Sequence, residues 1–141
     1  MRVSEIMSKD VHLASPQETI QQVARAMADQ NLGFMPVTDG DRLVGSVTDR
    51  DLVVRALASG LDADTMVREV MTNEVKYCFE DDEIDDVTRN MGDIQLRRLP
   101  VVSRDKRLVG VVSLADAALN DTDCAGRGLQ GIVRPGGAHT H

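Results

Sequence analysis

An internal repeat covers most of the 141 residues of this chain and restricts what it can fold into. Three pairs of segments align when the sequence is shifted by 64 residues, or by 65 after one inserted residue: VSEIMSKDV (3–11) with VREVMTNEV (67–75), MPV (35–37) with LPV (99–101), and RLVGSVTDRD (42–51) with RLVGVVSLAD (107–116). One copy of about 60 residues is too small to cover an apolar sheet face by itself, so two copies are expected to cover each other. The repeat therefore predicts a pseudo-twofold pair with paired clefts between the copies.

Each copy has the residue pattern of a β-α-β-β-α unit, which predicts an α+β fold. The expected elements of the first copy are a strand near 11–14, a helix capped by Ser15 with Pro16 at its first position, strands at 34–38 and 43–47, and a helix from Thr48 toward Ser59. The second copy repeats this order, with several acidic residues where its first helix begins.

The repeat also predicts the domain boundaries. They are residues 1–60 for the first copy, 61–66 for the linker and 67–120 for the second copy. Residues 121–141 are rich in glycine and have almost no apolar periodicity, which predicts a mobile C-terminal tail.

The composition excludes several classes of partner and site. The formal charge is −7 and no basic block stands out, so neither nucleic acid nor a membrane surface is an expected partner. Cys78 and Cys124 lie outside any CxxC or Cys/His cluster, which favours a reducing compartment and no metal site. No charged segment followed by an apolar run opens the chain, and no apolar run approaches a membrane span, so we expect a cytoplasmic protein.

The segment GSVTDRD (45–51) allows two interpretations. Thr48 and Asp51 have the spacing of a helix N-cap, and Ser113 and Asp116 repeat it in the second copy. The same strand-to-helix junction could hold a ribose and a phosphate, because an ionised carboxylate accepts hydrogen bonds from a cis-diol and a helix N-terminus accepts an anion. Gly45 would then leave room for a ligand near the backbone. Capping and binding can coexist in one residue.

The repeated motifs resemble the cystathionine β-synthase (CBS) domain family. LVGSVTDRD and LVGVVSLAD, each preceded by MPV or LPV and by the opening VSEIM or VREVM, look like a stand-alone tandem CBS pair, or Bateman module. The resemblance implies a regulatory signal-transduction module without catalytic activity. It would bind an AMP-like adenosine nucleotide, or ADP, ATP, NAD or S-adenosylmethionine, as a regulatory ligand, form a homodimer and act on a separate protein effector. The alternative is a structural or interaction dimer whose clefts are empty or only stabilising.

The resemblance also implies the nucleotide-binding residues, which are Val11, Thr48, Arg50, Asp51, Val75, Arg97, Arg98, Ser113 and Asp116. The hydroxyl side chains would contact phosphate, the two aspartates would contact ribose, and the backbone at the two valines would read the adenine edge. The arginines differ between the copies: Arg98 is the first candidate for a phosphate contact in the second site, Arg97 a weaker one, and Arg50 a candidate in the first. Each could equally be a solvated surface charge. We therefore expect the second site to favour AMP-like ligands.

No catalytic residues are predicted. His12 has no partner in the sequence for nucleophilic catalysis, and there is no Walker loop, GxGxxG or GxSxG motif. The acidic run EDDEIDD (80–86) lacks the spacing of an EF-hand, and it is interpreted as a helix cap with a solvated face. His139 and His141, in the predicted tail, are not assigned to a metal.

Overall fold

The computed structural model describes residues 1–120 and 122–133, and the chain divides into two compact units. The first unit is Val11–Val75. The second unit combines Met1–Asp10 with the chain from Lys76 onward. Each unit contains both helices and strands, so the predicted α+β class is confirmed.

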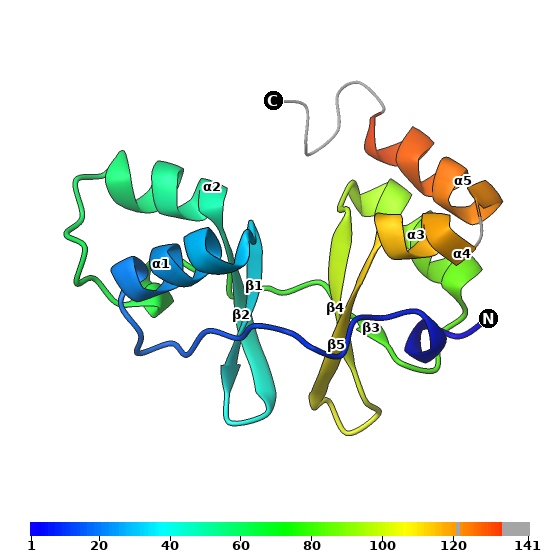
Figure 1. The fold of residues 1–141 in the computed structure, drawn as a ribbon, viewed down its shortest axis with the longest axis horizontal. Helices are drawn as coiled ribbons and strands as arrows, with labels where there is room; N and C mark the ends of the chain where they lie inside the picture. The colour runs from blue at the N-terminus through cyan, green and yellow to red at the C-terminus, as the bar shows by residue number, and fades with distance from the viewer. Residues whose placement is uncertain (121, 134–141) are drawn as a thin grey trace. The chain divides into compact units, whose positions relative to one another are not determined.

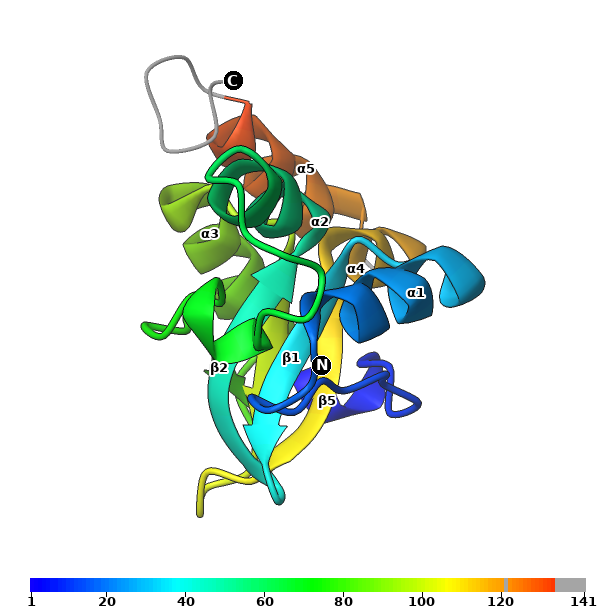
Figure 2. The same cartoon turned by 90° about the vertical axis from the view of Figure 1, so that its left-hand side faces the viewer.

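The first unit is built around an antiparallel hairpin. Its elements are α1 (Ile20–Gln30), β1 (Phe34–Asp39), β2 (Arg42–Thr48), α2 (Asp49–Asp51), the π-helical segment η2 (Leu52–Leu57) and the 3₁₀ turn η3 (Val67–Glu69). α2 continues directly into η2, and together they form the helix predicted to begin at Thr48. Figures 1 and 2 show that the β1–β2 turn lies at the end of the hairpin away from α2.

The second unit repeats this order and adds a helix. Its elements are η1 (Val3–Glu5), β3 (Cys78–Phe79), α3 (Ile84–Ile94), β4 (Arg98–Val102), β5 (Leu108–Ser113), α4 (Leu114–Asn120) and α5 (Thr122–Ile132). β3 is parallel to β4, and β4 is antiparallel to β5. The predicted opening strand is short here, and in the first unit it is reduced to one bridge between Ala14 and Val37.

Each unit has its own aliphatic core, and each core contains the opening segment of the other repeat. Val3 is fully buried with Leu99 and Val112 in the second unit, although Val3 opens the first repeat. Val67, which opens the second repeat, is fully buried with Val23 in the first unit. The sequence repeats and the compact units therefore do not coincide, because the two opening segments are exchanged.

Two glycines make this exchange possible. Gly45 in β2 lies under Met71 and Thr72, and a Cβ there would be 2.7 Å from Met71 Sδ and 2.9 Å from the Thr72 carbonyl oxygen. Gly110 in β5 lies under Met7 and Ser8 with the same closeness, 2.8 Å from Met7 Sδ and 2.7 Å from the Ser8 carbonyl oxygen. The prediction that Gly45 leaves space for a ligand is therefore wrong, because protein side chain and backbone occupy that space.

Backbone hydrogen bonds hold the exchanged segments at the same places. Ser46 and Thr72 exchange two N–H to carbonyl bonds of 3.0 and 2.8 Å, and Ser8 and Val111 exchange two of 2.8 and 3.0 Å. The exchanged segments thus extend the edge of each sheet by one bridge.

The start of α1 differs from its prediction. The N-cap is Thr19, not Ser15: the Gln22 N–H donates to Thr19 Oγ1 (3.1 Å) and the Thr19 N–H donates to Gln22 Oε1 (2.8 Å). Ser15 caps a separate tight turn, in which its N–H donates to Glu18 Oε1 (2.7 Å). Two consecutive capping boxes, at residues 15–18 and 19–22, stand in this sequence, and the later one starts the helix.

The prediction of a mobile tail is wrong for residues 122–132, which form α5. This helix packs beside α3 and α4 (Figure 1). A Cβ on Gly131 would lie 2.5 Å from Gly92 Cα, and Gln95 Nε2 donates to the Gly131 carbonyl oxygen (3.0 Å). Ile132 is buried in the core. α5 packs through glycines where an amphipathic helix has a row of apolar side chains. Its sequence therefore lacks the apolar periodicity that would have predicted a helix. Residues 121 and 134–141, including His139 and His141, lie outside the described residues.

Candidate functional site

The strand-to-helix junction of the first unit joins Thr48 and Asp51 in a reciprocal cap. The Thr48 N–H donates to Asp51 Oδ2 (2.9 Å), and the Asp51 N–H donates to Thr48 Oγ1 (3.1 Å). The Asp51 side chain retains 14% exposure. The N-cap interpretation of this motif is therefore correct.

The second unit builds the same junction from Ser113 and Asp116. The Ser113 N–H donates to Asp116 Oδ2 (3.0 Å), and the Asp116 N–H donates to Ser113 Oγ (3.0 Å). Both side chains are half-buried. In each junction the cap uses Oδ2 of the carboxylate, while a carboxylate has two oxygens and about four acceptor positions. The cap itself thus does not use Oδ1 in either junction.

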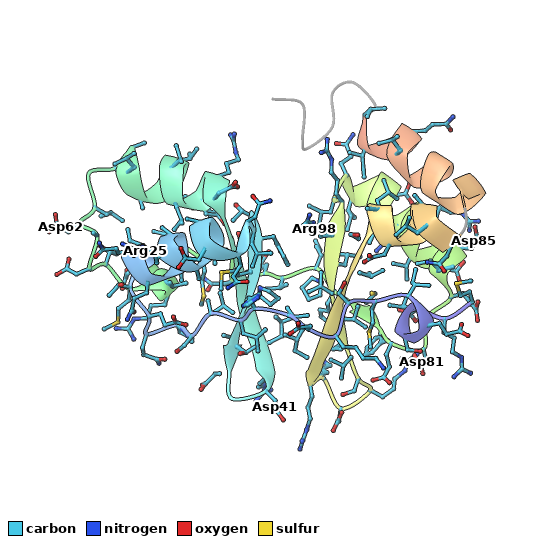
Figure 3. All side chains as sticks on the ribbon, viewed as in Figure 1. Arg25, Asp41, Asp62, Asp81, Asp85 and Arg98 are labelled. Atoms are coloured by element: carbon cyan, nitrogen blue, oxygen red, sulfur yellow. The ribbon has the colours of Figure 1, made fainter. Side chains whose placement is uncertain are left out.

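The structure places Arg98 beside the second junction. Arg98, labelled in Figure 3, begins β4. It is the direct cross-strand partner of Ser113 at the end of β5. Cross-strand partners have Cβ atoms about 5 Å apart on the same face of a sheet. Arg97 precedes it, and its carbonyl oxygen accepts the Leu114 N–H (2.8 Å). Both arginine side chains are exposed, so two cations accompany the Ser113–Asp116 pair.

The first junction has different neighbours. Phe34 is the cross-strand partner of Thr48, where the second unit has Arg98. Arg50 is exposed, and its backbone N–H donates to Asp49 Oδ1 (2.8 Å). Asp49 Oδ2 lies 3.2 Å from where a Gly33 Cβ would be. The contact between Gly33 and Asp49 was not predicted from the sequence, although the repeat alignment shows that both positions differ from the second copy.

Arg55 is a second residue that the sequence argument missed. Its Nε lies 3.7 Å from Asp51 Oδ1, and its Nη1 donates to the Val70 and Met71 carbonyl oxygens, both at 3.4 Å. The four-residue spacing from Asp51 is a signal for such a pair on a helix. At the equivalent position of the second copy stands Asn120, whose side chain donates to the Asp116 carbonyl oxygen (2.8 Å).

The two valines predicted to read adenine are not in strands. Val11 and Val75 are half-buried and lie at the two ends of the first unit, each three residues before the opening bridge or strand of a repeat. The structure thus groups Thr48, Arg50 and Asp51 in one junction and Arg97, Arg98, Ser113 and Asp116 in the other.

The part of the chain that the structure describes has no candidate metal site, and its Cys78 thiol is not activated. There, no three His, Cys, Asp or Glu side chains come together in a way that could hold a metal ion. Burial, with the nearby Asp82 charge as a smaller cause, raises the pKa of the Cys78 thiol to about 12, so it is a poor nucleophile at neutral pH. Among the helices of residues 1–120 and 122–133, none is both long and apolar enough to cross a bilayer.

Known proteins are similar to this chain over most of its length. CBS domain-containing protein YhcV of Bacillus subtilis is 38% identical over 132 residues, which cover 92% of this chain and 94% of YhcV. Hypoxic response protein 1 of Mycobacterium tuberculosis is 37% identical over 116 residues, 81% of this chain and 80% of that protein. The crystal structure of hypoxic response protein I with two coordinated zinc ions has a TM-score of 0.76, covering 84% of this chain and 98% of that one.

A solved relative contains adenosine ligands. The CBS domain pair of MJ0100, in complex with 5′-methylthioadenosine and S-adenosyl-L-methionine, is 29% identical with a TM-score of 0.73, covering 84% of this chain and 94% of that one. The family model for the CBS domain matches twice in this chain, at residues 3–57 and 67–120. These matches span most of the sequence and both junctions, and the chain therefore belongs to the CBS domain family.

Proposed function

We propose that this protein is a regulatory module that binds adenosine ligands at its two strand-to-helix junctions and passes the signal to a separate protein. The observation that carries the proposal is the same hydroxyl–carboxylate pair built twice, as Thr48 with Asp51 and as Ser113 with Asp116. The adenosine derivatives in the MJ0100 domain pair support it. A cytoplasmic location remains part of the proposal.

Each side chain has a role that follows from its chemistry. Oδ1 of Asp116 accepts from the ribose hydroxyls while Oδ2 keeps its capping bond. The Ser113 hydroxyl donates to a 5′-phosphate, and Arg98, its cross-strand partner, adds a charge-assisted bond. Arg97 supplies a second cation nearby. Val11 and Val75 are proposed to contact adenine through their backbone. The second junction is therefore the stronger site for AMP-like ligands.

The signal is proposed to pass through a homodimer. Apolar side chains are exposed near the end of the second helix of each repeat, with Leu57 73% and Leu119 87% exposed. Leu57 lies in the first unit and Leu119 in the second, and large exposed apolar side chains are candidates for an interaction surface in each unit. Size-exclusion chromatography with light scattering tests this, with Leu57→Glu and Leu119→Glu together expected to give a monomer. A wild-type protein that is monomeric at micromolar concentration would exclude the dimer.

The ligand proposal is tested by titration with AMP, ATP, NAD and S-adenosylmethionine. A ligand at 100 times its Kd stabilises the folded state by about 2.7 kcal/mol, which a thermal shift detects. Asp51→Asn and Asp116→Asn are the matched variants, because the asparagine amide oxygen can still accept the Thr48 or Ser113 N–H of the capping box but is one acceptor oxygen where carboxylate has two. The double variant should fold and lose at least about tenfold in affinity.

Two results would count against the proposal. If none of the four compounds shifts the unfolding temperature of the wild type, the structural or interaction dimer becomes the better description. If the double variant binds as tightly as the wild type, the carboxylates do not hold the ribose.

A further inference from the structure

We infer that the junction of the first unit selects an adenosine derivative whose 5′ group is uncharged or cationic, whereas the second junction takes the 5′-phosphorylated form. This inference rests on the proposed function and adds a division of ligands between the two sites. It depends on Asp49, a residue with no role in the ribose assignment.

The first observation is the contact between Asp49 and Gly33. Asp49 follows Thr48 directly, and its N–H donates to the Gly33 carbonyl oxygen (3.1 Å). Its carboxylate lies against the Gly33 Cα, with Oδ2 3.2 Å from a Cβ built there. A side chain at residue 33 would crowd this carboxylate, which would have to move by a few tenths of an ångström. The glycine therefore leaves a second carboxylate beside the Thr48–Asp51 pair.

The second unit has the opposite charge at these positions. Arg97 aligns with Gly33, and Leu114 aligns with Asp49. The backbone bond is the same, since the Leu114 N–H donates to the Arg97 carbonyl oxygen (2.8 Å). Leu114 is buried, and its Cδ1 lies 2.8 Å from a Cβ built on Gly128 of α5. The first junction thus has a glycine and an aspartate where the second has an arginine and a leucine, and both junctions have the same backbone hydrogen bond.

The arginines of the first junction do not restore a phosphate site as the second junction has one. Arg55 pairs with Asp51 and donates to the Val70 and Met71 carbonyl oxygens, so it is directed at the exchanged segment. The cross-strand partner of Thr48 is Phe34, which carries no charge. Arg50 is exposed and is a second cation at this junction, besides Arg55.

Electrostatics then separates the ligands. A 5′-phosphate bound at the Thr48 hydroxyl would lie near the carboxylates of both Asp49 and Asp51. Negative charges that lie close together repel each other, which weakens binding of the phosphate. A thioether has no charge, and the sulfonium of S-adenosylmethionine is attracted to the same carboxylates. At the second junction Arg97 and Arg98 reverse this preference.

The experiment measures ligand binding at one junction at a time, using the Asp→Asn variant that weakens ribose binding at the other junction. In Asp116→Asn only the first junction is intact, and in Asp51→Asn only the second. Calorimetric titration of both with AMP and with 5′-methylthioadenosine should show AMP binding at least about tenfold tighter to Asp51→Asn than to Asp116→Asn. 5′-Methylthioadenosine should show the opposite order. Equal AMP affinity in the two variants would overturn the inference.

A second variant tests Asp49 itself. Asp49→Asn, added to Asp116→Asn, keeps an oxygen that can accept the Arg50 N–H, and it should raise AMP affinity about tenfold relative to 5′-methylthioadenosine. Asp49→Ser serves the same purpose if the asparagine variant does not fold. An unchanged ratio of the two affinities would refute the role of Asp49. AMP binding to Asp116→Asn that disappears with Arg50→Ala would also refute it, because Arg50 would then form a phosphate site.

The outcomes separate this inference from the proposed function. If the wild type binds no adenosine compound, the proposed function fails. If it binds them with no difference between the junctions, the proposed function stands and the division of ligands fails.

Discussion

Met71 lies directly on Gly45, with its Sδ atom 2.7 Å from where a Cβ on that glycine would be. Met71 belongs to the second sequence repeat and Gly45 to the first, so this contact marks where the exchanged opening segment crosses β2. The equivalent contact joins Met7 and Gly110 in the second unit. A side chain at either glycine must push the exchanged segment away from its sheet.

Gly45→Ala and Gly110→Ala are therefore expected to destabilise the protein, by about 1–3 kcal/mol each. Rotation of the methionine alone does not relieve the clash at Gly45, because the Thr72 carbonyl oxygen is also 2.9 Å away. Urea unfolding measures the change in the free energy of unfolding. In a Met71→Ala background, Gly45→Ala should cost less than in the wild type. A Gly45→Ala protein as stable as the wild type would contradict the close packing.

The two junction caps predict a second set of stability changes. Thr48→Ala and Ser113→Ala each remove the acceptor for a backbone N–H, which costs about 0.5–2 kcal/mol. Thr48→Ser keeps the hydroxyl and is the matched control. Chemical denaturation without ligand should place Thr48→Ser near the wild type and Thr48→Ala below it. Equal stabilities of the serine and alanine variants would mean that the hydroxyl does not cap the helix.

The glycines of α5 predict opposite effects of one substitution. Gly131→Ala should lower the free energy of unfolding by about 1–3 kcal/mol, because its Cβ would meet the backbone of Gly92 at 2.5 Å. Gly126→Ala should raise it by up to about 1 kcal/mol, because Gly126 is exposed and nothing lies within 4 Å of its Cβ position. Thermal or urea unfolding of both variants measures the pair. If both substitutions stabilise the protein, α5 does not pack against α3 as described.

The buried thiol predicts a loss of stability at high pH. Burial and the Asp82 charge raise the pKa of Cys78 from an ordinary 9.0 to about 12. Between these values the thiol of the unfolded chain ionises while the folded one stays protonated, so stability falls as pH rises from about 9 toward 12. The free energy of unfolding against pH should fall less steeply in Cys78→Ala than in the wild type. The same slope in both proteins would refute the shift.

A thiol reagent gives an independent check of the same burial. In a Cys124→Ser background at pH 8, Cys78 should react slowly in the folded protein and rapidly in urea, because only the thiolate reacts. Fast reaction of the folded protein would show that Cys78 is accessible.

Much of this structure could be predicted from local patterns. The alignment at a shift of 65 residues paired Thr48 with Ser113 and Asp51 with Asp116, and each copy forms the same cap. The hairpin of each copy and the helix that follows it could be predicted from short apolar runs and their spacing. One copy of the repeat contains all the residues that this prediction needs. Arg98 could be placed near Ser113 because a hairpin register follows from the strands and their turn.

Other features could not be read from local patterns. Ser15 and Thr19 each have a capping partner three residues later, and only the contacts of Ile20 and Gln21 with the backbone of Thr65 and Ala63 distinguish them. α5 carries glycines where an amphipathic helix carries apolar residues, so its pattern resembled a tail. The contact between Gly33 and Asp49 joins residues whose proximity depends on the folded hairpin.

The sequence by itself determined that the chain is duplicated, the order of elements in each copy and the two hydroxyl–carboxylate pairs, because repetition and local hydrogen bonding need only neighbouring residues. The tertiary structure decided which opening segment enters which core, where α5 packs and which charges stand beside each junction. Those outcomes depend on the steric fit of distant segments, such as Met71 on Gly45 and Gly131 on Gly92, and no local pattern specifies a fit between two surfaces.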